Sequence, residues 1–319
     1  MTEPAAGRGP DGGLRNAVAA AWLRLSPNHR GALWMIGASL GFTVNSAFVK
    51  SLSAEGLDTF QIAFARAVFS SLVLAPFFYR AGFAALRSTV PGLHAVRAVS
   101  GSLAMVCGFY AVGQLPLAEF TALTFTQPLF VILLAVLILK ETVRWRRWLA
   151  TAIGFLGVLV MVRPGAAAFD PAALIALASV FGIALAVTLV KRLPPGESHV
   201  TMLAYFCIAS IVMTAAPALA AWQAPSLSQW GLLAAVGLLG IASQAMIIRA
   251  YRSGEASFVA PFDYLKLILA GLIGFLVFAE IPDHWTVAGA VIIVGSTFYI
   301  ARREAAQRPA EARSAAPPA

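Results

Sequence analysis

Charged residues are scarce in this sequence, and most of it reads as long apolar stretches. Asp, Glu, Lys and Arg make up 12% of the 319 residues and hydrophobic residues make up 60%, whereas a soluble domain has roughly 25% charged residues. The net charge of +9 would suggest a nucleic-acid partner in a soluble protein, but in so apolar a chain the positions of the charges decide. We therefore expect an integral membrane protein in a lipid bilayer, with no nucleic-acid partner and no separate soluble domain.

Several functional motifs are missing as well. The two cysteines, Cys107 and Cys207, each stand inside an apolar stretch, which excludes a disulfide framework and a cysteine metal site. There is no Walker G-x-x-x-x-G-K-[ST] sequence and no H-E-x-x-H sequence, so ATP-driven pumping and zinc proteolysis are not indicated. We expect no enzyme activity, no metal and no cofactor. A membrane-embedded enzyme is the competing class, and it would need a nucleophile paired with a base, or a metal cluster, at membrane depth.

Ten apolar stretches can cross a bilayer, each crossing taking about 20 residues, so the predicted fold is an all-α integral membrane protein. The predicted spans are 31–50, 59–79, 94–113, 117–139, 146–163, 171–190, 199–221, 228–248, 256–279 and 285–301. Residues 1–30 are expected to form a cytoplasmic tail. Residues 304–319 are rich in Ala, Pro and Arg without an apolar period and are expected to be disordered.

The second half of the chain repeats the first. Lys50 is followed 26 residues later by Pro76, and Lys191 is followed 26 residues later by Pro217. Each half carries five spans, so the second half enters the bilayer from the opposite side and the two halves form an inverted repeat. Such repeats are typical of secondary transporters. The predicted repeats are residues 31–163 and 171–303.

The basic residues give the chain an orientation. With the N-terminus in the cytoplasm, 19 of the 23 Lys and Arg residues fall on the cytoplasmic side of ten spans. Only Lys50 and Arg163 fall on the opposite side, and Arg66 and Lys266 fall inside spans. Because cytoplasmic loops are enriched in Lys and Arg, we expect both termini in the cytoplasm and a multi-pass protein of the bacterial inner membrane.

Three charged residues inside the spans are the first candidates for a substrate site. Arg66 lies roughly 12 Å into a core of about 30 Å, and intramembrane charges usually face a bundle interior or a wet cavity; otherwise its side chain reaches the interface or pairs locally. Asp263 and Lys266 share one helix face, where they either neutralise each other or, with Tyr264, meet a polar solute at a helix opened by Pro261. Asp263 is the candidate for coupling to protons.

Weaker polar candidates lie on other spans. Thr124 and Gln127 precede a proline in the fourth span, as in the interrupted helices of repeat transporters, although threonine hydroxyls often bond back to their own helix. Asn45, Tyr110 and Gln244 are further polar residues that could line a central cavity.

The chain resembles the ten-helix members of the drug/metabolite transporter superfamily that are built from two EamA domains, over residues 31–303. The residues that carry the resemblance are Lys50, the Ala-Arg-Ala around Arg66, Pro116–Glu141 ending in Leu-Ile-Leu-Lys-Glu, Val259–Glu280 with Pro-Phe-Asp-Tyr-Leu-Lys-Leu, Gly289 and Gly295. The resemblance implies a central cavity, alternating access and a small polar metabolite as substrate.

The resemblance does not fix the substrate. Members with a similar Pro-Phe-Asp-Tyr-Leu-(Lys/Arg) segment are associated with S-adenosylmethionine uptake, and others with amino acid export or riboflavin uptake. We expect a zwitterionic or cationic metabolite such as an amino acid or S-adenosylmethionine. The alternatives are riboflavin or another vitamin or drug, and, in other classes, a channel or the enzyme considered above. Monomer and homodimer both stay open.

Overall fold

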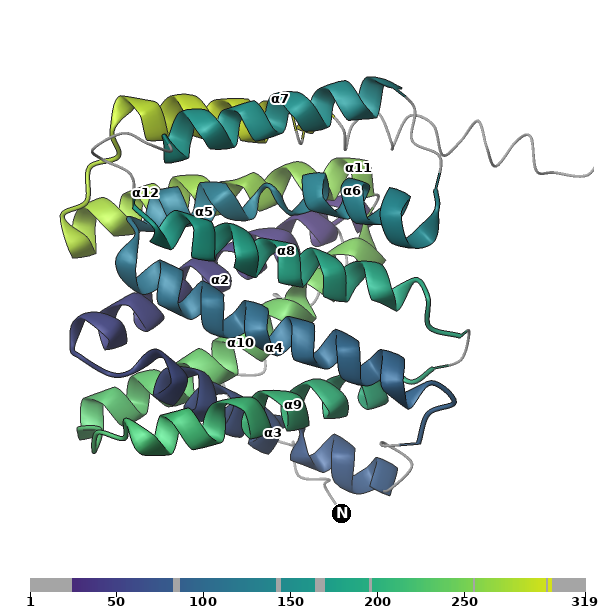
Figure 1. The fold of residues 1–319 in the computed structure, drawn as a ribbon, viewed down its shortest axis with the longest axis vertical. Helices are drawn as coiled ribbons and strands as arrows, with labels where there is room; N and C mark the ends of the chain where they lie inside the picture. The colour runs from purple at the N-terminus through teal and green to yellow at the C-terminus, as the bar shows by residue number, and fades with distance from the viewer. Residues whose placement is uncertain are drawn as a thin grey trace, which may run out of the picture.

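The computed structural model describes residues 25–82, 87–141, 145–163, 170–194, 197–254, 256–296 and 298–299. Most of the two predicted tails lies outside these residues. The part of the first tail that is described already contains helix, because the first span begins at Pro27 instead of residue 31. The described residues form helices joined by short connections, with no strand among them, and the long helices lie side by side (Figure 1).

The prediction of ten spans is confirmed. Two spans are interrupted: α5 and α6 make up the fourth, and α11, the 3₁₀ helix η2 and α12 make up the ninth. Eight spans are long and apolar enough to cross a membrane, and α7 and the last helix are shorter apolar helices. The helices are α2 (Pro27–Ala54), α3 (Thr59–Ala81), α4 (Pro91–Gln114), α5 (Leu117–Thr124), α6 (Gln127–Leu139), α7 (Trp145–Val162), α8 (Ala172–Val190), α9 (His199–Ala220), α10 (Leu227–Ser253), α11 (Ala256–Val259), η2 (Ala260–Tyr264), α12 (Leu265–Phe278) and the last helix, His284–Ser296.

Polar residues in the short connections start several helices. The carboxylate of Asp58 accepts a hydrogen bond from the N–H of Phe60 at 2.8 Å at the start of α3. The hydroxyl of Ser226 and the side chain of Gln229 form a capping box at the start of α10. These side chains satisfy backbone N–H groups that have no partner within the helix, so each connection can be short.

The two halves pack in the crosswise manner expected of an inverted repeat. α2 packs along α10 and α4 packs along α8, so the first helix of each half meets the third helix of the other. Repeat-matched glycines allow both contacts: a Cβ at Gly41 would lie 2.3 Å from the hydroxyl of Ser243, and a Cβ at Gly182 would lie 2.9 Å from the Cβ of Ala104. α3 packs against α9, which pairs the second helix of each half with its own counterpart.

α7 and the last helix form a layer at one end of the molecule, away from α3 and α9 (Figure 1). They pack closely through Gly157 and Gly289, where an added Cβ at Gly289 would lie 2.7 Å from the Gly157 carbonyl oxygen. Val158, Met161 and Ile293 fill the contact. This layer leaves the other eight spans to enclose the centre of the protein.

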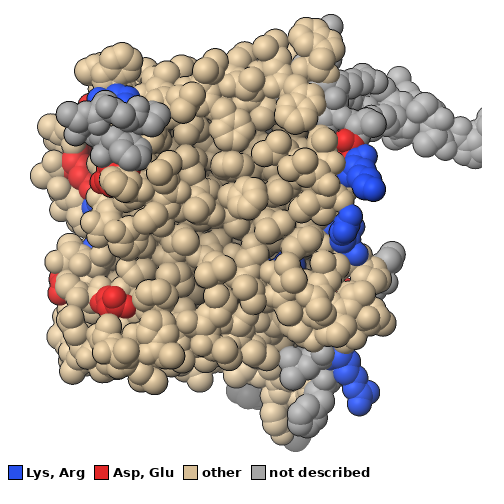
Figure 2. Space-filling view, viewed as in Figure 1, with Lys and Arg blue, Asp and Glu red and all other residues tan. Residues whose placement is uncertain are grey.

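The charges visible on the face in Figure 2 lie at the two ends of the helices. In Figure 2 most visible Lys and Arg lie at one edge of the molecule and most visible Asp and Glu lie at the opposite edge, with a wide uncharged band between them. The helices run from one edge to the other (Figure 1). An apolar band bounded by charges is the surface expected of a protein that crosses a bilayer.

Candidate substrate site

Two of the spans that contain a proline are interrupted. In the fourth span, Phe125 and Thr126 separate α5 from α6. In the ninth span, the backbone changes to 3₁₀ geometry at Ala260–Tyr264, which contains Pro261, as the lost proline N–H favours. Because α12 packs against α5, the two interrupted spans meet inside the protein.

Arg66 on α3 lies in a space made by its neighbours on α4 and α10. Its guanidinium contacts the sulfur of Met105 and lies 5.5 Å from the ring centroid of Phe109. A Cβ at Gly240 would lie 3.3 Å from two guanidinium nitrogens, so the absent side chain makes room for the charge. The Nε atom is buried without a hydrogen-bond partner, and among the described residues no carboxylate lies within ion-pair distance of Arg66.

Two pairs of repeat-matched residues lie close to each other. Arg66 and Cys207 match at an offset of 141 and lie on α3 and α9, which pack against each other. Phe125 and Tyr264 match at an offset of 139, and their ring centroids are 5.0 Å apart. A residue lies beside its own counterpart only near the axis that relates the two halves. In an inverted repeat this axis lies in the membrane plane, so Arg66 and Tyr264 lie near the bilayer midplane, where repeat transporters bind substrate.

Asp263 and Lys266 form an ion pair at the start of α12. Their side chains are 29% and 18% exposed, and the Lys266 ammonium lies 5.1 Å from the ring centroid of Phe42 on α2. The sequence allowed two interpretations, and the structure shows the first of them: Asp263 and Lys266 neutralise each other. The partial exposure still leaves this pair open to a polar solute.

The remaining polar candidates on α2, α4 and α10 differ in burial and in their hydrogen-bond partners. The amide of Asn45 is buried and donates a hydrogen bond to the carbonyl of Val236 at 2.7 Å, so it joins α2 to α10. Tyr110 is 41% exposed and follows Phe109, which turns it about 100° away from the Arg66 side of α4. Gln244 on α10 is also exposed.

The two candidates in the fourth span lie beside its interruption. The hydroxyl of Thr124 donates to the carbonyl of Thr121 at 2.6 Å, which is the bond to its own helix considered above. Gln127 is half-buried at the first residue of α6. The substrate role of all nine candidates stays a prediction.

Sequence reasoning missed a buried ion pair between Lys50 and Glu280. The ammonium lies 2.7 Å from the carboxylate and donates to the carbonyl of Leu115 at 2.6 Å, while the carboxylate accepts from the N–H of Leu117 at 2.7 Å. The sequence analysis named both residues, Lys50 as the counterpart of Lys191 and Glu280 as the end of the Val259–Glu280 stretch. The inverted order of the halves, which brings the first helix of one half to the other half, was the sequence signal that could have predicted this pair.

Two further polar clusters lie in connections outside the spans. Glu197 accepts hydrogen bonds from Ser88 and Thr89 and pairs with His94 at 3.0 Å. The Ser88 hydroxyl, with His94 and Thr89, lowers the pKa of the Glu197 carboxyl, against the smaller effect of partial burial. Burial alone would raise the pKa of Asp283, but hydrogen bonds within its helix start and the nearby Arg163 lower it.

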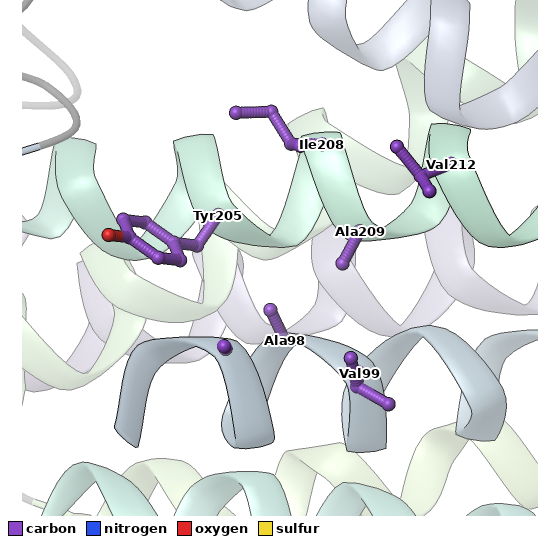
Figure 3. A pocket seen from close by; sticks show the side chains of 7 residues that line it. Ala98, Val99, Tyr205, Ile208, Ala209 and Val212 are labelled. Carbon is purple, nitrogen blue, oxygen red and sulfur yellow. The ribbon is translucent and has the colours of Figure 1, made fainter. Parts of the chain in front are cut away.

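An apolar groove of about 310 Å³ lies between α4 and α9. Figure 3 shows Ala98 of α4 and Ala209 of α9 pointing toward each other, and the groove is also lined by Val99, Ile208 and Val212. Val99, Ile208 and Val212 are exposed at the molecular surface, which in a bilayer is the surface that meets lipid. With an apolar lining, this groove does not suit a polar metabolite.

Comparison with known proteins identifies the family. The model of the EamA-like transporter family matches residues 29–163 and 170–302. A crystal structure of a 20% identical protein matches with a TM-score of 0.55 over 86% of this chain and 98% of that one, which supports the fold alone.

Three similar proteins have named substrates. The S-adenosylmethionine uptake transporter of Rickettsia prowazekii is 32% identical over 85% of this chain and 92% of its own length. The riboflavin transporter of Vibrio cholerae is 32% identical over 86% and 94%. The pseudopaline exporter CntI of Pseudomonas aeruginosa is 33% identical over 85% and 96%. The chain belongs to the EamA-like transporter family and is a membrane transporter of small metabolites.

Proposed function

We propose that this transporter takes up S-adenosylmethionine across a bacterial inner membrane by alternating access. The observation that carries the proposal is the guanidinium of Arg66, which lies near the midplane with no carboxylate partner among the described residues. A charge at that depth is costly unless something pairs with it. A substrate carboxylate supplies that partner, and arginine binds carboxylates through two parallel hydrogen bonds.

The ion pair of Asp263 and Lys266 supports a substrate that also carries positive charge. The Asp263 side chain is 29% exposed and its Oδ1 is buried against Lys266, so a sulfonium or ammonium group would compete with Lys266 for the carboxylate. S-adenosylmethionine has a carboxylate, an ammonium and a sulfonium group, and its adenine ring can stack on an aromatic side chain such as Tyr264. The relatives named as S-adenosylmethionine uptake transporters agree with this substrate and with import.

Riboflavin is the second candidate. The aromatic pair of Phe125 and Tyr264 would suit a flat ring system, and two riboflavin transporters are among the relatives. Riboflavin has no carboxylate, however, so it would leave Arg66 without an ionic partner. This difference makes the two substrates separable by experiment.

Thermal unfolding of the purified protein with a panel of ligands tests the proposal. The panel is S-adenosylmethionine, its decarboxylated analogue, S-adenosylhomocysteine, riboflavin and arginine. A ligand at 100 times its Kd stabilises a protein by about 2.7 kcal/mol, so S-adenosylmethionine should raise the Tm clearly and the decarboxylated analogue much less. Stabilisation by riboflavin alone would overturn the assignment, and uptake into proteoliposomes that fails to saturate would indicate a channel.

The orientation is part of the proposal. Both termini are proposed to lie in the cytoplasm, with residues 31–163 and 171–303 as the two repeats that move against each other. The concentration of visible basic residues at one edge of the molecule supports this orientation (Figure 2). A reporter active only in the cytoplasm, fused after residue 319, should be active; an inactive reporter with intact transport would reverse the topology.

A further inference from the structure

Four charged residues, matched in pairs by the repeat, bind each other crosswise. Lys50 matches Lys191, and Glu141 matches Glu280. In the structure Lys50 binds Glu280 and Lys191 binds Glu141. Each pair therefore joins the first helix of one half to the fourth helix of the other. Because the halves are inverted, the two pairs lie at opposite faces of the membrane, called below the Lys50 face and the Lys191 face.

The same local structure presents both glutamates. Each follows a residue in the left-handed conformation, Lys140 with φ 55° and ψ 31° and Ala279 with φ 54° and ψ 31°. The N–H of Glu141 donates to the carbonyl of Ala135 at 3.2 Å, and the N–H of Glu280 donates to that of Gly274 at 3.0 Å. These bonds end both helices in one capping geometry. Any difference between the two pairs therefore comes from how the helices are packed.

The two pairs differ in distance and in burial. Lys50 and Glu280 are 2.7 Å apart, with side chains 11% and 15% exposed. Both are also bound to the connection between α4 and α5, through the carbonyl of Leu115 and the N–H of Leu117. Lys191 and Glu141 are 3.3 Å apart, with side chains 57% and 45% exposed. An exposed pair contributes little to stability, whereas breaking a buried pair is costly.

We infer that the two pairs are alternating latches of the transport cycle. In this structure the Lys50 latch is closed, because it is buried and also bound to the connection between α4 and α5, and the Lys191 latch is loose. Exchanging the conformations of two inverted halves converts one state of such a transporter into the other. In the opposite state Lys191 and Glu141 should become the short, buried pair, and Lys50 and Glu280 should become exposed. This inference goes beyond the proposed substrate and does not depend on it.

A buried reporter cysteine tests the latch without any substrate. Leu117 is fully buried and its N–H binds Glu280, so Leu117→Cys reports opening of the Lys50 face. The protein is kept in detergent with a hydrophilic maleimide, and mass spectrometry separates the reporter from Cys107 and Cys207. Glu280→Gln should speed alkylation of the reporter about tenfold or more, since the buried pair is lost. The matched control Glu141→Gln should leave the rate unchanged or lower it.

A second variant separates opening from damage. Glu280→Gln leaves the Lys50 charge buried without its partner and could unfold the protein. The double variant Lys50→Met/Glu280→Gln removes both charges, so it should stay folded by size exclusion and still show the faster alkylation. Equal acceleration by Glu280→Gln and Glu141→Gln would overturn the inference. So would an inert reporter in the folded double variant.

Discussion

Replacing Arg66 by methionine should change binding and stability in opposite directions. Methionine has a similar length and no charge, so it can keep the contacts that Arg66 makes with Met105 and Phe109. If Arg66 holds the substrate carboxylate, the variant loses charge-assisted hydrogen bonds worth about 1.5–3 kcal/mol. That loss corresponds to a Kd for S-adenosylmethionine raised about 10- to 150-fold.

The empty protein should gain stability from the same change. The Nε of Arg66 is buried without a partner, and no described carboxylate pairs with the guanidinium. Removing a buried charge that lacks an ionic partner relieves its desolvation cost, so we expect Arg66→Met to raise the Tm in the absence of ligand. The contact with the Phe109 ring offsets part of this gain.

Equilibrium binding and thermal unfolding of the same preparations measure both effects. The decarboxylated analogue of S-adenosylmethionine completes a double-mutant cycle. It should bind the wild type weakly, and Arg66→Met should lower its affinity little further, because the guanidinium and the missing carboxylate are each other's partners. Arg66→Lys keeps the charge without the two-pronged geometry and should fall between the two. A variant that is less stable when empty and binds S-adenosylmethionine with unchanged Kd would refute the reasoning and assign Arg66 to packing.

Three further predictions concern other parts of the molecule. If Asp263 lines the transport path, Asp263→Asn should abolish uptake into proteoliposomes without changing the size-exclusion profile; normal uptake would remove it from the path. Gly289→Ala should cost about 1–3 kcal/mol, seen as a lower Tm, because the new Cβ meets the Gly157 carbonyl oxygen at 2.7 Å, whereas Gly295→Ala meets open space and should be neutral. The lowered pKa of Glu197 means that its stabilising contribution is present above the usual carboxyl pKa and is lost as the pH falls through the lowered value. The Tm of Glu197→Gln should therefore depend less on pH below about 4.5; an unchanged acid slope would contradict this.

The spans and the inverted order of the halves could be predicted because they depend on local features. Apolar length marks each span, and the Lys50 to Pro76 spacing recurs in the second half. The change of helix geometry near Pro261 also follows from the chemistry of a single residue. These signals need no knowledge of which helices touch.

The partners of the polar residues depend on that knowledge. Asn45 was a candidate to line a cavity, and its amide meets the carbonyl of Val236 because α2 and α10 lie close together. Lys50 and Glu280 are far apart in the sequence and meet only because the halves pack crosswise. The Thr124 hydroxyl can reach the carbonyl of Thr121 on its own helix, and the sequence could not decide between that carbonyl and a substrate as its partner.

The position of Arg66 beside its own counterpart restricts what the second half can carry there. Had position 207 kept an arginine, two guanidinium groups would face each other at the centre of the bilayer and repel. The cysteine at that position removes the repulsion and leaves one charge where the shared frame provides two equivalent places. Under the proposed function, a substrate carboxylate would therefore meet the guanidinium of Arg66 but no matching charge at position 207. If Arg66 binds the substrate as proposed, two symmetric halves can move while this one residue orients the bound metabolite.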